Sequence, residues 1–129
     1  MTDNDFFNLA VKASEKSYSP YSNFKVGAVL LTSDGQVFTG CNIENVSYSL
    51  TMCAERTAFF KAISSGFTDF KAIAVAGSYD DDFSNPCMPC GACLQVMSEF
   101  CDDDFMIVLA DGVHKLSDFL PKRFKLWNI

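Results

Sequence analysis

Three cysteines in two separate segments constrain the fold of this chain more than any other feature. Cys53 stands alone near the middle of the chain, and Cys90 and Cys93 follow in a Pro-Cys-x-x-Cys sequence. A catalytic zinc ion takes three protein ligands and keeps one position for water, and thiolate is one of its preferred ligands. The three cysteines meet that count if the fold brings the two segments together.

The Pro-Cys-x-x-Cys pattern occurs in two overlapping registers, one with the pair Cys87 and Cys90 and one with the pair Cys90 and Cys93. Spacing alone does not distinguish them. We favour Cys90 and Cys93, because the glycine and alanine between them let the backbone approach a metal closely and no proline interrupts the turn into a helix. The alternative is a structural zinc site, which recruits a fourth protein ligand, with Cys87 in that role.

Both cysteine segments stand where we expect helices to begin, and the N-terminal end of a helix favours thiolate over thiol. Glu55 falls in the first turn of the earlier helix, where a carboxylate in a partly dehydrated pocket suits proton transfer. The simpler interpretation of Glu55 is a favourable charge at a helix N-terminus. We expect Arg56 to balance the negative charge that three thiolates place on a divalent ion, and the alternative is an exposed helix residue.

Length and charge narrow the protein class. The 129 residues suit a single domain over 1–129, and 49% apolar with 20% charged residues is typical of a globular protein. The net charge of −6 gives no basic surface for a phosphate backbone, so we expect no nucleic-acid partner. The sequence has no apolar run of the roughly 18 residues that a membrane helix needs and no basic start of a secretory signal, so we expect a cytoplasmic protein with its cysteines as free thiols or ligands.

The order of the predicted elements is that of an α/β protein. Helical spacing predicts helices over 5–16, with Asp3 and Asn4 as candidate caps, over 53–64, closed by Gly66, and after Cys93. Strands are predicted at 24–31 and 36–42, which form a hairpin, and at 72–76, 106–110 and 113–116, before a short helix over 117–121. This alternation predicts layers around a mixed sheet, with ligands bound at the carboxyl ends of strands.

With Cys53-Ala54-Glu55 and Pro89-Cys90-Gly91-Ala92-Cys93, the chain resembles the zinc-dependent cytidine deaminases, specifically their short-chain homotetrameric type. Further matching segments are Tyr18-Ser19-Pro20-Tyr21-Ser22, Gly40-Cys41-Asn42-Ile43-Glu44-Asn45 and Leu120-Pro121 with Phe124, so nearly the whole chain is covered. The resemblance implies a three-layer α/β/α fold with a mixed, mainly five-stranded sheet and one zinc ion per chain. It also implies hydrolysis of cytidine and deoxycytidine to uridine or deoxyuridine and ammonia, in pyrimidine salvage.

The resemblance also assigns roles to residues. Glu55 would move protons between water, the ring and the leaving amino group. Asn42 and Glu44 would hydrogen-bond the ribose hydroxyls. Phe24 would pack against the nucleoside, and the Ala54 backbone would contact the pyrimidine carbonyl. Tyr48 would line a shared pocket, and Phe124 would reach into the active site of a neighbouring subunit. Without the resemblance, Phe24 and Phe124 would be core or interface residues and Glu44 a solvated loop charge.

Two positions depart from the family pattern. Leu94 stands where many relatives carry an arginine after the last ligand, and Cys87 with Met88 precedes the metal motif. The alternatives are a polynucleotide-editing deaminase, which the acidic charge disfavours, a zinc-stabilised binding module without catalysis, and a deaminase of a nucleotide or of a cytidine-like antibiotic. Glu44 would repel a nearby phosphate and so favours a nucleoside. Cys41 and Cys101 are interpreted as small buried residues and His114 as a surface residue.

Overall fold

A five-stranded mixed sheet forms the centre of the protein, in a computed structural model that describes residues 1–126. The strands are β1 (Lys25–Thr32), β2 (Val37–Cys41), β3 (Phe70–Ser78), β4 (Met106–Leu109) and β5 (Gly112–Lys115), in the order β2-β1-β3-β4-β5. β1 is antiparallel to β2 and β3, β3 is parallel to β4, and β4 is antiparallel to β5. The predicted mixed sheet is therefore confirmed, and its strand ends differ from the predicted ones by one or two residues.

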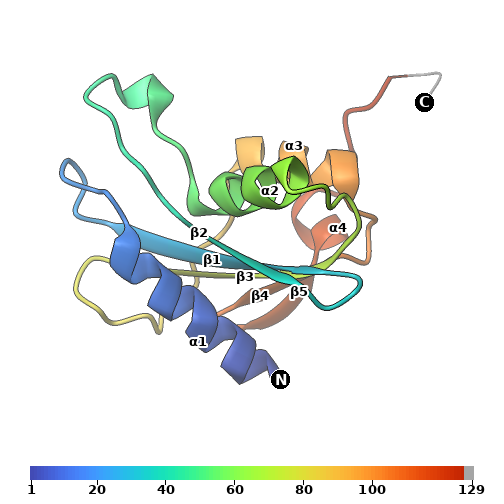
Figure 1. Cartoon of the computed structure of the whole chain (residues 1–129), viewed down its shortest axis with the longest axis horizontal. Helices are drawn as coiled ribbons and strands as arrows, with labels where there is room; N and C mark the ends of the chain where they lie inside the picture. The colour runs from blue at the N-terminus through green and yellow to red at the C-terminus, as the bar shows by residue number, and fades with distance from the viewer. Residues whose placement is uncertain (127–129) are drawn as a thin grey trace.

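Helices cover both faces of the sheet (Figure 1). α1 (Asp3–Ala13) packs on one face, and α2 (Ala54–Ser64), α3 (Gly91–Phe100) and α4 (Leu116–Phe119) lie on the other. This arrangement confirms the three-layer prediction. None of the helices within residues 1–126 has both the length and the apolar character to cross a membrane.

The first helix starts earlier than predicted, and the expected caps are wrong. Thr2 is the N-cap: its hydroxyl accepts from the Asp5 backbone N–H at 3.0 Å, and its own N–H donates to the Asp5 carboxylate at 3.1 Å. Asp3 lies in the first turn instead, because this reciprocal pair satisfies two N–H groups that a helix start leaves unpaired. The last predicted turn is a 3₁₀ helix, Ser14–Lys16.

β3 is buried on both faces, as its continuous apolar sequence predicts. Ile73 and Val75 belong to the core beneath α2 and α3, whereas Ala72, Ala74 and Ala76 pack in the core beneath α1. The small alanines allow α1 to pack closely on this face. The strand ends at Ser78, from which the chain runs toward the second cysteine segment.

α2 lies unusually close to the sheet, and Gly40 on β2 is the reason. A Cβ atom at Gly40 would lie 2.4 Å from the Ala54 carbonyl oxygen and 2.6 Å from the Ala58 nitrogen, which are distances that no side chain tolerates. The glycine thus lets the first turn of α2 rest on β2. Because Cys53 is the N-cap of α2, this contact also fixes where the first cysteine stands.

Candidate metal centre and active site

Three cysteine sulfurs meet where α2 and α3 begin. Cys53 is the N-cap of α2, Cys90 is the N-cap of α3, and Cys93 lies in the first turn of α3. The Sγ atoms of Cys53 and Cys90 are 3.8 Å apart, those of Cys90 and Cys93 are 3.5 Å apart, and all three lie within 4.8 Å of one another. The fold therefore brings together the three cysteines of the favoured register.

Cys87 does not join this cluster. Within residues 1–126, the group of side chains close enough to share a metal ion comprises Cys53, Cys90 and Cys93 alone. Burial, with the charges of Glu55 and Cys53, raises the pKa of the Cys87 thiol to about 12, which keeps it protonated. A set of three thiol ligands with one position left open fits a catalytic zinc ion rather than a closed structural site.

Arg56 places a positive charge against the sulfurs. Its Nη2 donates to Cys53 Sγ at 3.4 Å, and its buried Nε has no hydrogen-bond partner in the described part of the chain. Hydrogen bonds from Cys93, Arg56 and Cys90 lower the pKa of Cys53 to about 5, against the effect of burial. A half-buried guanidinium of this kind suits a cluster of thiolates and therefore supports the fit to a metal ion.

Glu55 lies beside the sulfurs in the first turn of α2 and is only 4% exposed. Burial is the main cause that raises the pKa of its carboxyl to about 7, and the charge of Cys53 adds to the effect. A carboxyl group with such a value is able both to accept and to release a proton near neutral pH. Its place in the first turn of α2 also agrees with the simpler interpretation, a favourable charge at a helix N-terminus.

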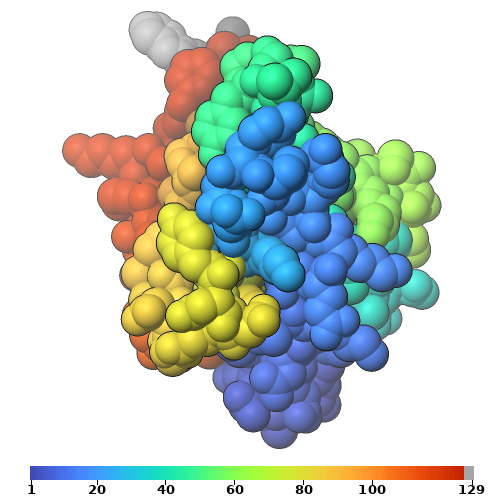
Figure 2. Space-filling model, turned by 90° about the vertical axis from the view of Figure 1, so that its left-hand side faces the viewer, coloured from blue at the N-terminus to red at the C-terminus, as the bar shows by residue number. Residues whose placement is uncertain are grey.

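A cavity of about 300 Å³ opens beside the cluster and reaches Glu55 and two of the cysteines. Its lining includes five residues predicted for the substrate site, namely Phe24, Asn42, Glu44, Tyr48 and Ala54. Figure 2 looks onto the face where the segments around 18–25 (blue), 42–52 (green) and 79–85 (yellow) meet, and these segments contribute to the lining. Residues far apart in the sequence thus form one pocket that ends at the candidate metal centre.

Asn42 is 7% exposed, and neighbours occupy most of its amide. Its Oδ1 accepts hydrogen bonds from the Val26 backbone N–H at 3.0 Å and from the Ser17 hydroxyl. Its Nδ2 donates to the Phe24 carbonyl oxygen at 2.7 Å. Since an amide nitrogen carries two hydrogens, one donor of Asn42 remains for a ligand.

Glu44 is only 5% exposed, so its interpretation as a solvated loop charge is wrong. Its Oε1 accepts from the backbone N–H groups of Tyr21 at 3.0 Å and Ser22 at 3.1 Å, and its Oε2 accepts from the Ser22 hydroxyl at 2.5 Å. The Ser22 hydroxyl is the main cause that lowers the pKa of Glu44. One acceptor position remains on Oε2, so Asn42 and Glu44 together offer one donor and one acceptor, the complement of a single hydroxyl group.

Several lining residues were not predicted from the sequence. The ring of Tyr79 lies 4.6 Å from that of Phe24, and Ser22, Cys87 and Met88 also line the cavity. Ser22 stands in a segment that the sequence marked as a family match, but nothing in the sequence assigned it a contact. Tyr79 follows β3 in an acidic loop, where no pattern indicated a pocket wall.

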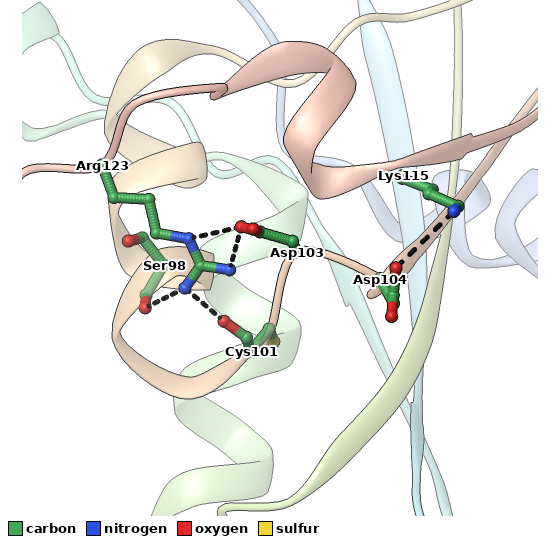
Figure 3. A network of polar contacts seen from close by, with 6 residues as sticks. All are labelled: Ser98, Cys101, Asp103, Asp104, Lys115 and Arg123. Atoms are coloured by element: carbon green, nitrogen blue, oxygen red, sulfur yellow. Dashed lines mark hydrogen bonds and ion pairs between the residues drawn. The ribbon is translucent and has the colours of Figure 1, made fainter.

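Phe124 lies outside the cavity of its own chain. It is 71% exposed and belongs to a surface groove at the C-terminal end of α3. Arg123 fixes this part of the chain: it donates to Asp103 Oδ1 at 3.1 and 2.8 Å, and to the carbonyl oxygens of Ser98 and Cys101 at 3.2 and 2.7 Å (Figure 3). The predicted contact of Phe124 with substrate therefore requires a second copy of the chain.

The remaining sequence expectations lie away from the cavity. Leu94 is 7% exposed in the core, so no second cation stands at that position. Cys101 is buried as expected, whereas Cys41 is only partly buried and donates to the Lys16 carbonyl oxygen at 3.4 Å. His114 is half-buried rather than on the open surface, and its Nε2 lies 2.8 Å from Asp111 Oδ1.

Comparison with known proteins identifies close relatives. A family model of the cytidine and deoxycytidylate deaminase zinc-binding region matches residues 1–109. A cytidine deaminase from Halalkalibacterium halodurans is 54% identical over 120 residues, which are 89% of this chain and 88% of that protein. One from Sporosarcina psychrophila is 54% identical over 100 residues, 78% of this chain and 71% of that protein.

Solved structures agree with this comparison. The crystal structure of cytidine deaminase from Burkholderia pseudomallei matches with a TM-score of 0.86 and 48% identity, over 96% of this chain and all of that chain. The enzyme from Mycobacterium tuberculosis matches with a TM-score of 0.87 and 38% identity, over 98% of this chain and 99% of that chain. The likeness thus covers the sheet, the helices and the cysteine segments together.

Proposed function

The chain belongs to the cytidine and deoxycytidylate deaminase family, and from that membership we propose how its own residues deaminate cytidine. The reaction is hydrolysis: the exocyclic amino group leaves C4 of the pyrimidine as ammonia, and uridine remains. Cys53, Cys90 and Cys93 hold one zinc ion, whose chemistry when bound is to activate water for attack on C4. The observation that carries this proposal is the buried Glu55 beside three converging sulfurs at the end of a cavity.

Glu55 moves the protons. It takes one proton from the attacking water and delivers it to ring N3, then takes the proton of the new C4 hydroxyl and delivers it to the amino group, which leaves as ammonia. Two features support this role: Glu55 lines the cavity two residues after a metal ligand, and its carboxyl is shielded from bulk water. Arg56, which contacts Cys53, balances the charge of the thiolates and does not touch the substrate.

The other end of the cavity recognises the nucleoside. Phe24 packs against the base, and the Ala54 N–H, which as a first-turn helix group has no partner within α2, donates to the pyrimidine carbonyl. Asn42 and Glu44 bind one sugar hydroxyl with their remaining donor and acceptor. Cytidine and deoxycytidine both carry a 3′-hydroxyl, which we assign to this pair, so both are substrates, whereas the Glu44 carboxylate repels a phosphate group.

The active unit is a homotetramer with shared active sites. Support comes from Phe124, which is exposed outside its own cavity, and from Val46 and Leu50, which are 83% and 66% exposed in the segment whose neighbouring residues line the cavity. In such an assembly Phe124 of one chain and Tyr48 of another complete one pocket. The setting is the cytoplasm and the role is pyrimidine salvage, which is consistent with six free cysteines.

The test is the ultraviolet absorbance change on mixing cytidine with purified protein of known zinc content. We expect turnover of cytidine and deoxycytidine with one zinc ion per chain, and little turnover of cytidine 5′-phosphate. Glu55→Gln should keep its zinc and lose turnover. Zinc-loaded protein that converts none of these substrates would contradict the proposal, and a fully active Glu55→Gln variant would remove the role of Glu55.

A further inference from the structure

Ser22 connects two walls of the cavity through one hydroxyl group. The hydroxyl donates to Glu44 Oε2 at 2.5 Å and accepts from the Phe24 backbone N–H at 3.0 Å. A serine hydroxyl has a single hydrogen, so its donation is committed to the carboxylate. The residue that faces the base and the residue that faces the sugar are therefore held by the same side chain.

The two oxygens of Glu44 are held in different ways. Backbone N–H groups of Tyr21 and Ser22 occupy Oε1, whereas the Ser22 hydroxyl is the one protein group that binds Oε2 in the described part of the chain. Oε2 is also the oxygen with an acceptor position left for a ligand. Without the hydroxyl, the carboxylate is free to turn about the bonds at Oε1.

We propose that Ser22 is a positioning residue that orients the free acceptor of Glu44 toward a sugar hydroxyl and fixes the position of Glu44 relative to Phe24. The inference rests on the proposed function, in which Glu44 binds the sugar and Phe24 packs on the base. Ser22 is half-buried and lines the same cavity. Its hydrogen bond also favours the ionised form of Glu44, and an ionised acceptor makes a stronger bond to a hydroxyl.

The first test is a comparison of kcat and KM. Ser22→Ala should raise KM for cytidine roughly tenfold and leave kcat nearly unchanged, because the sugar contact is the same in the ground state and the transition state. Ser22→Thr keeps the hydroxyl and should keep a low KM, and Ser22→Cys, a weaker donor, should fall between them. The matched control is Ser33→Ala, which removes a serine-to-carboxylate hydrogen bond of 2.9 Å to Asp69, outside the cavity.

The second test uses a substrate that lacks the 2′- and 3′-hydroxyls of the sugar. The loss of kcat/KM caused by Ser22→Ala should be about tenfold for cytidine and should disappear for 2′,3′-dideoxycytidine, because Glu44 then has no 3′-hydroxyl to bind. An equal loss for both substrates would overturn the proposal, since a general distortion of the pocket does not depend on the sugar.

Different results contradict the proposed function and the role of Ser22. If the wild-type protein deaminates cytidine but does not prefer it to the dideoxy analogue, Glu44 does not read the sugar, and the role of Ser22 is overturned with it. If the wild-type protein prefers cytidine and Ser22→Ala retains both that preference and its KM, only the role of Ser22 is overturned. Absence of deamination in the wild-type protein would overturn the proposed function itself.

Discussion

Arg56 Nη2 lies 3.4 Å from the Cys53 sulfur, and Arg56 stands on α2, the helix that also carries Glu55. Three thiolates and one divalent zinc ion leave one net negative charge, and the guanidinium is placed to neutralise it. Leu94, the other position considered for a cation, is a buried apolar side chain. We propose that, of these two positions, Arg56 alone balances the charge at the metal centre.

Loss of the Arg56 charge should weaken zinc binding. Arg56→Gln is expected to reduce zinc affinity about tenfold or more, which is the usual effect of removing a group that hydrogen-bonds to a metal ligand. The measurement is competition for zinc with a chromogenic chelator. Arg123→Gln serves as the matched control, because Arg123 binds the other end of α3. Equal zinc release from Arg56→Gln and the wild-type protein would contradict the role in charge balance.

Zinc removal should destabilise the fold, because the ion joins the N-terminal ends of α2 and α3. A ligand that binds only the folded chain stabilises it by about 2.7 kcal/mol when free ligand is at 100 times Kd. We therefore expect the melting temperature to fall on dialysis against a chelator and to return when zinc is added. Calorimetry of the two forms measures the effect. A melting temperature that does not depend on zinc would show that the ion is not held by both helices.

Gly77 on β3 should control the width of the cavity. A Cβ atom at this position would lie 2.8 Å from Phe24 Cζ and 2.9 Å from Cys87 Sγ, both of which are side-chain ends that can move into the cavity. Gly77→Ala is therefore expected to raise KM for cytidine on the order of tenfold at a small cost in stability. Gly77→Ala combined with Cys87→Ala should recover part of the affinity. An unchanged KM in the single variant would contradict this prediction.

Local features of the sequence carried the prediction of the fold. Within residues 1–126, apolar spacing and turn signals located the four α-helices and the five strands within a few residues, whereas the 3₁₀ helix Tyr48–Leu50 was predicted as a loop. The continuous apolar sequence of β3 indicated burial on both sides, which the two cores confirm. The N-cap was wrong because Thr2 and Asp3 are both good caps, and only the reciprocal bonds with Asp5 select between them.

The cavity was less predictable than the metal cluster. Residue type and spacing in the sequence are enough to predict cysteine ligands, so the three ligand positions could be proposed from the sequence alone. Which of the two overlapping registers supplies the pair depends on where α3 begins, which is a result of packing. Ser22 and Tyr79 line the cavity through contacts with residues distant in the sequence, and a serine or tyrosine in a loop has no local pattern that indicates such contacts.

Glu44 should contribute to stability in a pH-dependent manner. The Ser22 hydroxyl and two backbone N–H groups lower the pKa of this carboxyl below its ordinary value of 4.5 in the folded protein. Its contribution is therefore fully present above the pKa of the unfolded chain and is lost as the pH falls through the folded value. We expect the stability difference between the wild-type protein and Glu44→Gln, measured by urea unfolding, to be larger at pH 7 than below pH 4. Glu99→Gln, at an exposed carboxylate on α3, is the control, and a difference that does not change with pH would contradict the prediction.

Phe124 should act on the active site of a neighbouring chain. Because its ring is 71% exposed and lies outside its own cavity, Phe124→Ala should raise KM for cytidine with little change in melting temperature. Exposure of the ring means that its removal leaves no internal void, so the fold should lose little stability.

Oligomers that contain two different impaired variants show whether the Phe124 ring acts on the active site of its own chain or on that of a neighbouring chain. In an oligomer that contains both Phe124→Ala and Glu55→Gln chains, a pocket with an intact Glu55 can receive an intact Phe124 only from the other type of chain. Co-expression of the two variants should therefore restore a population of sites with the wild-type KM, whereas separately purified variants that do not exchange subunits should show no recovery. If co-expressed chains retain the high KM of Phe124→Ala at every active site, the ring does not act between subunits, and its exposure at the end of α3 serves another contact.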